Sequence, residues 1–207
     1  METFTAPFVG LATALAATFF PGMLNMTAVA TSLRVGRRAG YRFAQGLAIT
    51  LLVQAGVAVL FAEYLGSHPG IIGGMKRYAV LIFVALAVFF FVKAWRGRHR
   101  PLADRPYHGS PFWRGVAMAI MNFLTLPYFF AVTGWLVASG YLSTVLAARL
   151  GFTLGVGAGA LLVFGLYARS AAWIDRNAHY LTQNINYVLG GLFTLLAVVQ
   201  GVRLLHP

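Results

Sequence analysis

The sequence contains no cysteine and only four acidic residues among its 207 residues. The absence of cysteine excludes disulfide bonds, thiol redox chemistry and thiolate metal sites. Charged residues make up only 10% of the chain, whereas soluble domains carry about a quarter. Hydrophobic residues make up 59%. This composition predicts an all-α integral membrane protein, because long apolar runs cross a bilayer as helices.

Catalytic and metal-binding patterns are also missing. The five histidines and four acids are scattered, with no spacing such as His-Glu-x-x-His. No Ser-His-Asp group, phosphate-binding loop or pair of acids can be assembled from the sequence. We therefore expect no enzyme activity, no metal site and no cofactor.

Runs with few or no charged residues predict six transmembrane helices. Each run is long enough to cross most or all of a hydrocarbon core about 30 Å thick. The approximate ranges are 4–33, 43–65, 78–95, 113–138, 145–168 and 185–205. Because the number of spans is even, both termini are predicted to lie on the same side of the membrane.

Lysine and arginine are distributed unequally between the two sides. Twelve fall on the side of the loop 96–112 and four on the other. Basic residues are enriched on the cytoplasmic side of membrane proteins. We therefore expect the loop 96–112 to be cytoplasmic and both termini to be periplasmic. The basic loops would contact anionic lipid headgroups, so the net charge of +12 does not call for a nucleic acid partner.

The loop 96–112 divides the sequence into two halves of three spans, 1–95 and 113–207. The first span runs inward and the fourth outward, so the halves are predicted to be inverted repeats. The first helix of each half is predicted to be broken at a proline, Pro21 or Pro127. Matched interruptions in two inverted halves point to a transporter site at the bilayer midplane. A proline in a membrane helix can also serve packing alone, and this reading stays open.

Two smaller patterns concern helix packing. Phe43-x-x-Gly46 in the second span resembles Phe152-x-x-Gly155 in the fifth. The strip Gly155, Gly157 and Gly159 predicts a close approach of two helices, either inside the chain or in a homodimer. Gln54 is a lone polar residue in the second span, so it serves either a helix–helix hydrogen bond or a cavity.

Residues around the two interruptions are polar but uncharged. Proline lacks an N–H, so Pro21 frees the carbonyl of Ala17, and a helix beginning near Gly22 would offer its N–H groups to an anion. Pro127 would free the carbonyl of Phe123, an acceptor suited to an ammonium group. The side chains expected to bond freed carbonyls at the first break are Thr18, Asn25 and Thr27. The predicted substrate-binding residues are Pro21, Gly22, Asn25, Thr27, Asn122, Thr125 and Pro127, and a zwitterion fits this set.

These motifs resemble the LysE/RhtB superfamily of bacterial amino-acid exporters. Family members typically carry Pro-Gly-Pro-Asn in the first span and a Gly-Arg-Arg-Ala-Gly turn at a fixed distance. Here Pro21-Gly22 is followed at that distance by Gly36-Arg37-Arg38-Ala39-Gly40. The family motif Asn-Pro-Lys in the fourth span is partly present as Asn122-Phe123-Leu124. Leu24 occupies the family asparagine position, with Asn25 one residue later, and Leu124 occupies the lysine position.

The resemblance implies a secondary transporter in the bacterial inner membrane. It would export an amino acid or a related small zwitterionic metabolite by alternating access. The absence of a deep acidic residue does not favour basic amino acids or proton coupling. Two alternatives stay open, namely an ion or metal exporter on a similar six-helix plan and a non-transporting membrane scaffold.

Overall fold

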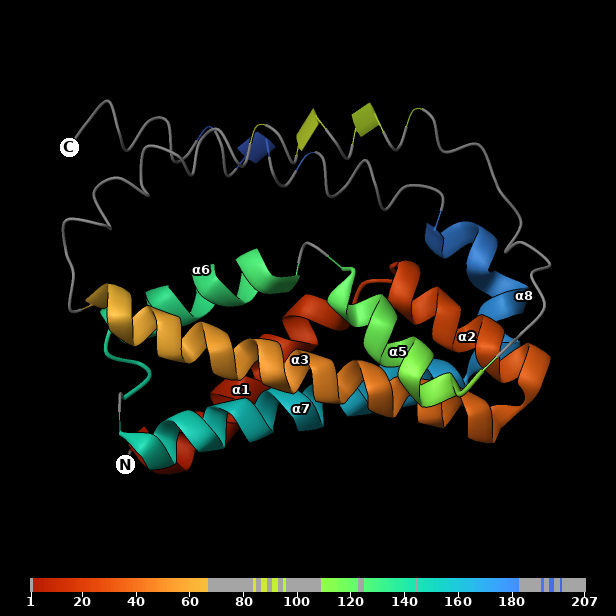
Figure 1. Ribbon diagram of the computed structural model, residues 1–207. Coiled ribbons are helices and arrows are strands. Elements are labelled where there is room, and N and C mark those ends of the chain that lie inside the picture. Colours follow the sequence, from red (N-terminus) through yellow and green to blue (C-terminus); the bar gives the residue numbers. More distant parts are fainter. Residues whose placement is uncertain are drawn as a thin grey trace. The chain divides into compact units, whose positions relative to one another are not determined.

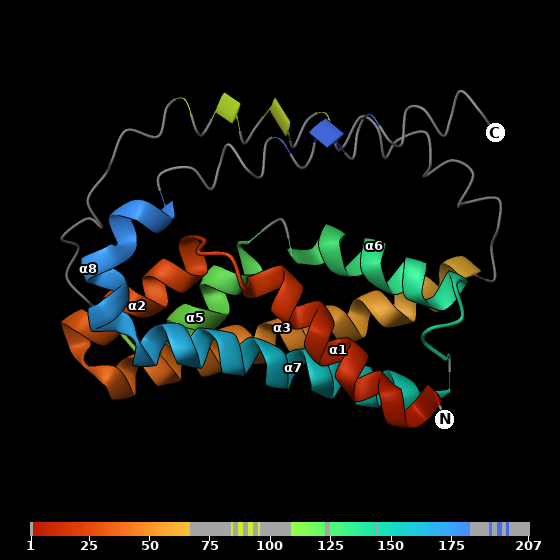
Figure 2. The same cartoon turned by 180° about the vertical axis from the view of Figure 1, so that it is seen from behind.

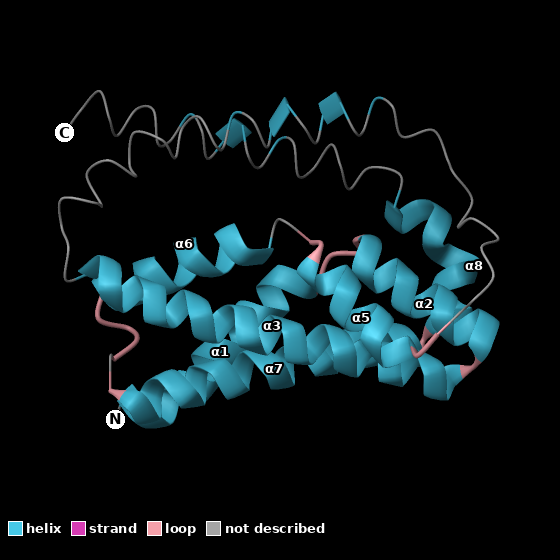
Figure 3. Ribbon diagram, viewed as in Figure 1, coloured by secondary structure: helices cyan, strands magenta, loops and turns pink. Residues whose placement is uncertain are grey.

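The computed structural model describes residues 2–66, 109–122, 125–143 and 145–182, together with ten isolated positions between 84 and 198. Within this part of the chain every regular element is an α-helix (Figures 1 and 3). The helices are α1 (Glu2–Thr18), α2 (Met23–Val35), α3 (Arg37–Gly66), α5 (Pro111–Ile120), α6 (Thr125–Ala138), α7 (Leu146–Arg169) and α8 (Ala171–Thr182).

The chain divides into two compact units. One consists of Met1–Ser67 with Pro106–Ala178, and the other of His68–Arg105 with His179–Pro207. The first unit contains α1, α2, α3, α5, α6, α7 and the start of α8, so it combines helices from both predicted halves of the sequence. All contacts given below lie within this unit.

Four of the six predicted spans fall in the described residues. The helices α3 and α7 are each long and apolar enough to cross a membrane alone. The helices α1 and α2 qualify only as a pair bent by 81°, and α5 and α6 as a pair bent by 65°. These findings agree with an all-helical membrane protein. Apart from isolated positions, the predicted spans 78–95 and 185–205 lie outside the described residues.

Glycines bring the backbones of α1 and α7 into contact. A Cβ atom on Gly10 of α1 would collide with the carbonyl oxygen of Phe152 on α7, and one on Gly155 would collide with the carbonyl oxygen of Pro7. Gly159 faces Leu11 of α1, whereas Gly157 faces a side chain of α3. The predicted glycine strip therefore serves packing inside the chain.

The same arrangement recurs between α3 and α5. A Cβ atom on Gly46 of α3 would collide with the carbonyl oxygen of Phe112, and one on Gly115 of α5 would collide with the carbonyl oxygen of Phe43. Figures 1 and 2 show α5 beside α3 and α1 beside α7. The Phe-x-x-Gly similarity between the second and fifth spans thus marks the surfaces on which the broken helices pack.

Large apolar side chains fill the interior and also cover much of the outside. The fully buried ones include Phe43, Phe129, Phe152 and Phe164. Trp113, Leu154 and Trp173 are more than half exposed. An apolar exterior is expected where helices face lipid.

The glycine contacts predict that added methyl groups destabilise the fold. Gly155→Ala or Gly46→Ala should lower the free energy of unfolding by about 1–3 kcal/mol, because the opposing backbone carbonyl cannot move aside cheaply. The measurement is the midpoint of thermal unfolding of the purified protein in detergent. Gly134→Ala is the matched control, since a Cβ at Gly134 on α6 meets no atom within 4 Å. Equal midpoints for all three variants would contradict this account of the packing.

Candidate functional site

The first break lies where the sequence predicts it. Helix α1 ends at Thr18, and α2 begins at Met23 with Gly22 as its N-cap residue. Gly22 has extended backbone angles, φ −112° and ψ −174°, and provides no side-chain cap. The cause is Pro21, because its ring crowds the preceding turn and it has no N–H to continue the helix.

Asn25 holds the broken end of α1. Its side chain is only 3% exposed, and Nδ2 donates hydrogen bonds to the carbonyl oxygens of Thr18 (2.7 Å) and Phe20 (3.1 Å). The hydroxyl of Tyr167 on α7 donates to the carbonyl oxygen between them, that of Phe19, at 2.9 Å. Three successive carbonyls at the break are thus bonded by two side chains. Both N–H groups of the Asn25 side-chain amide donate to these backbone carbonyls. The role of this residue in substrate binding stays a prediction.

The two threonines expected to assist at this break do not. The hydroxyl of Thr18 donates to the carbonyl of Ala14 at 2.7 Å, and that of Thr27 donates to the carbonyl of Met23 at 2.7 Å. Each acceptor lies one turn earlier in the same helix. A threonine hydroxyl reaches this carbonyl without leaving its own helix, which is why it does not bridge the break.

The second break precedes Pro127, contrary to the expectation that this proline interrupts the helix. Helix α5 ends at Ile120 and α6 begins at Thr125, so Pro127 is the third residue of α6. The first N–H groups of a helix have no partner inside it, and a proline in this turn therefore costs no hydrogen bond. The carbonyl of Phe123, which this proline was expected to free, lies outside the described residues.

Asn122 lies in the second break itself, and hydrogen bonds of its backbone link the end of α5 to the start of α6. Its N–H donates to the carbonyl oxygen of Ala119 at 3.2 Å, and its own carbonyl accepts a bond from the hydroxyl of Thr125 at 2.9 Å. From α3, the Gln54 Nε2 atom also donates to Ala119, at 3.3 Å. A side chain of a neighbouring helix therefore bonds the broken end of α5, as Tyr167 does for α1.

Contacts between the broken pairs connect the two breaks. The hydroxyl of Tyr128, in the first turns of α6, donates to the carbonyl oxygen of Thr13 on α1 at 2.9 Å. Helix α2 contacts α5 in turn. Asn25, Thr27 and Thr125 are buried, Pro21 and Asn122 are partly exposed, and Gly22 and Pro127 are exposed. Within the described residues, no hydrogen bond joins the predicted site residues of one break directly to those of the other.

Two tyrosines were missed by the sequence reasoning. Tyr128 and Tyr167 each connect a break or its flanking helix to a distant part of the chain. Both lie in apolar spans, where a phenol hydroxyl needs a hydrogen-bond partner. That need was a usable signal, although the partner could not be named from sequence.

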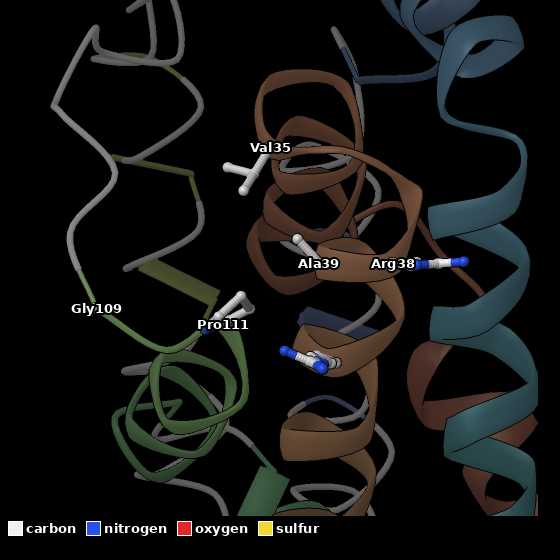
Figure 4. Close-up of a pocket in the computed structure, with 6 residues that line it drawn as sticks. Val35, Arg38, Ala39, Gly109 and Pro111 are labelled. Carbon is white, nitrogen blue, oxygen red and sulfur yellow. The ribbon is translucent and has the colours of Figure 1, made fainter.

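A separate hollow of about 360 Å³ lies where α2 meets α3. Figure 4 shows it beside Gly109 and Pro111 at the start of α5, with Arg38 directed away from Pro111. Its lining residues are Val35, Arg38, Ala39, Arg42, Gly109 and Pro111. The two arginines are exposed, and neither break contributes a residue to this hollow.

The hydrogen bonds at the first break predict a stabilising role for Asn25. Asn25→Leu keeps the size of the side chain but leaves the buried carbonyl of Thr18 and the partly buried carbonyl of Phe20 without its donor, which should cost about 1–3 kcal/mol of stability. Thermal unfolding in detergent would show the loss, with a smaller one for Tyr167→Phe. Thr27→Val is the control on the same helix, since its hydroxyl bonds only to its own helix. A midpoint for Asn25→Leu equal to that of the control would refute the role.

The model of the LysE type translocator family matches residues 15–203 of this chain. The match covers most of the sequence and includes both breaks. Comparison with curated proteins gave no match, and comparison with solved structures gave none either.

Proposed function

Since this chain belongs to the LysE type translocator family, a family of transporters and not of enzymes, we propose that it exports an amino acid or a related small zwitterionic metabolite across the bacterial inner membrane. The observation that carries the proposal is the pair of bent, interrupted helices, α1 with α2 and α5 with α6. Irregular backbone at membrane depth is tolerated only where protein buries it or where it lines a cavity. Substrate sites of secondary transporters are typically built from such discontinuous helices.

The helix contacts among the first two spans of each half support a repeat of the two halves. Exchanging the halves replaces α1 by α5, α2 by α6 and α3 by α7. The α1–α7, α2–α7 and α1–α6 contacts then become α5–α3, α6–α3 and α5–α2, and all six of these contacts occur. The glycine contacts follow the same exchange, because Pro7 and Gly10 meet α7 as Phe112 and Gly115 meet α3. The extensive α2–α3 contact has no equally extensive counterpart between α6 and α7.

The chemistry of the two breaks supports a zwitterionic substrate. The first N–H groups of α2 have no partner within the helix, and Gly22 supplies no capping side chain. Such a helix start attracts a carboxylate. The second break carries the Asn122 side chain and the carbonyl-rich end of α5, which suit an ammonium group. A zwitterion bound between the breaks would place its carboxylate at the start of α2 and its ammonium group at the end of α5.

Alternating access would use the breaks as hinges. The helices α3 and α7 are continuous and pack directly on each other, so they form a scaffold. Each broken pair packs its first helix against the scaffold helix of the other half. Rocking of the broken pairs about their breaks would expose the site to one side of the membrane and then to the other.

Export from proteoliposomes tests the proposal. Vesicles are loaded with a mixture of the twenty standard amino acids, and their exit is followed by mass spectrometry. The wild-type protein should release a subset faster than empty vesicles do, and Pro21→Ala should reduce that release at least tenfold, because alanine restores the N–H and allows α1 to continue into α2. Pro111→Ala is the control, since a proline at the first position of α5 removes no helical bond.

Other outcomes would favour the alternatives. If folded wild-type protein releases no amino acid, labelled ions are the next solutes to test. If no solute moves, the result would favour the alternative that the protein is a non-transporting membrane scaffold. Normal export by Pro21→Ala would remove the first break from the site.

We further propose that the end of the helix bundle at the α2–α3 turn faces the cytoplasm. Gly40 in α3 lies against Ala168 near the end of α7, and the hollow places Val35 beside Pro111 at the start of α5. Seven of the arginines belong to this end, namely Arg34, Arg37, Arg38, Arg42, Arg114, Arg169 and Arg176. The positive-inside rule assigns it to the cytoplasm, where these side chains would contact anionic headgroups.

Single cysteines test this orientation without background, because the chain has none of its own. Ser110→Cys before α5 and Ser139→Cys after α6 are a matched pair of exposed positions. In intact cells, a membrane-impermeant maleimide should label position 139 and leave position 110 unlabelled until the cells are opened. The reverse pattern would contradict the proposed orientation and would place both termini in the cytoplasm.

A further inference from the structure

Gln54 carries a buried hydrogen-bond acceptor that nothing in the described part of the chain uses. The residue is 7% exposed in the middle of α3, and its Oε1 atom is sealed from solvent without a partner. Its Nε2 atom is engaged with the carbonyl oxygen of Ala119. The side chain therefore has one end bonded to the second break and the other end unsatisfied.

Chemistry determines which end is free. A carbonyl oxygen can only accept a hydrogen bond, so the amide nitrogen must face Ala119 and the amide oxygen must point elsewhere. Turning the amide over would bring two oxygens together and leave the nitrogen without its acceptor. The unsatisfied group is consequently an acceptor, and only a donor can complete it.

The bond to Ala119 places the Gln54 side-chain amide near the backbone N–H of Asn122. Gln54 Nε2 and the Asn122 N–H donate to the same oxygen, that of Ala119, at 3.3 and 3.2 Å. The Asn122 side chain is partly exposed and makes no hydrogen bond to any described residue. Thr125, in contrast, already bonds to the Asn122 carbonyl. Two amide groups with unused bonding capacity thus adjoin one helix break.

Other buried polar side chains nearby mostly have hydrogen-bond partners, so the unpaired oxygen of Gln54 is unusual among them. Asn25 uses both of its N–H bonds at the first break. Thr50, one turn before Gln54 on α3, bonds to Gly46 of its own helix at 3.0 Å. Ser32 also has an unsatisfied oxygen, but it lies against Gly40 near the α2–α3 turn and not at a break. Buried polar groups normally have partners, so the Gln54 oxygen calls for one.

We infer that Gln54 is a substrate-binding residue whose Oε1 accepts a hydrogen bond from the ammonium group of the exported molecule. The inference rests on the proposed export of a zwitterion and assigns its two charges to different breaks. The carboxylate lies at the start of α2, and the ammonium lies between Gln54 and Asn122. Recognition of the ammonium is thereby achieved by neutral amides, without a buried acid.

The test compares each exported amino acid with its des-amino analogue, the carboxylic acid in which hydrogen replaces the ammonium group. The twenty-amino-acid mixture identifies what wild-type vesicles release. Exit rates then give KM for the most rapidly released amino acid, and inhibition by the analogue gives the preference for the ammonium. Wild-type protein should prefer the amino acid by about tenfold or more, as expected for one hydrogen bond to a charged group.

Variants of Gln54 separate binding from structure. Gln54→Leu should raise KM about tenfold, leave the maximal rate within about twofold and abolish most of the preference over the analogue. Gln54→Glu retains Oε1 and adds a charge, so it should keep or increase the preference, and it serves as the test if the leucine variant does not fold. Thr50→Val is the control on the same face of α3 and should match the wild type.

The remaining outcomes distinguish a failure of the Gln54 inference from a failure of the proposed export function. If Gln54→Leu slows the amino acid and the analogue equally, the residue is structural and the inference fails while export stands. If Gln54→Glu loses the preference, the oxygen does not receive the ammonium. If wild-type vesicles release no amino acid at all, the proposed function fails first and the inference with it.

Discussion

The structure depends on one constraint, which is that a backbone carbonyl freed inside a membrane span must find a donor within the protein. Lipid supplies none, and an unsatisfied carbonyl there is costly. Pro21 ends α1, and the carbonyls of the three residues before it are bonded by Asn25 from α2 and Tyr167 from α7. At the second break Gln54 bonds the end of α5 from α3. Each interruption is therefore held by a neighbouring helix, which makes the breaks part of the fold.

Close packing between helix backbones provides the frame in which those donors reach their acceptors. Gly10 and Gly155 allow α1 to lie directly on α7, and Gly46 and Gly115 do the same for α3 and α5. Tyr167 can reach the α1 break only because α7 is this close to α1. The glycines and the hydrogen bonds are thus two parts of one arrangement. In it, α1 depends on α7, and α5 depends on α3.

Sequence reasoning succeeded where a residue acts on its own chain segment. It located the first break, because the lost N–H and the ring of Pro21 act locally. It also named Asn25 as a donor at this break, although the carbonyls that Asn25 bonds are those of Thr18 and Phe20 and not the predicted one of Ala17. It misplaced the second break, because a proline can begin a helix as readily as interrupt one. It also overestimated Thr18 and Thr27, whose hydroxyls bond within their own helices.

The sequence by itself determined the membrane class, the four apolar spans that lie in the described residues and the membership of a transporter family, because these follow from composition, long uncharged runs and short motifs. Only the tertiary structure decided which helices meet and which polar groups are left over. Gln54 illustrates the difference. Its amide is visible in the sequence, but the state of its oxygen depends on Ala119, 65 residues away. Contacts between distant segments determine whether a buried polar group is satisfied, and no local pattern encodes that outcome.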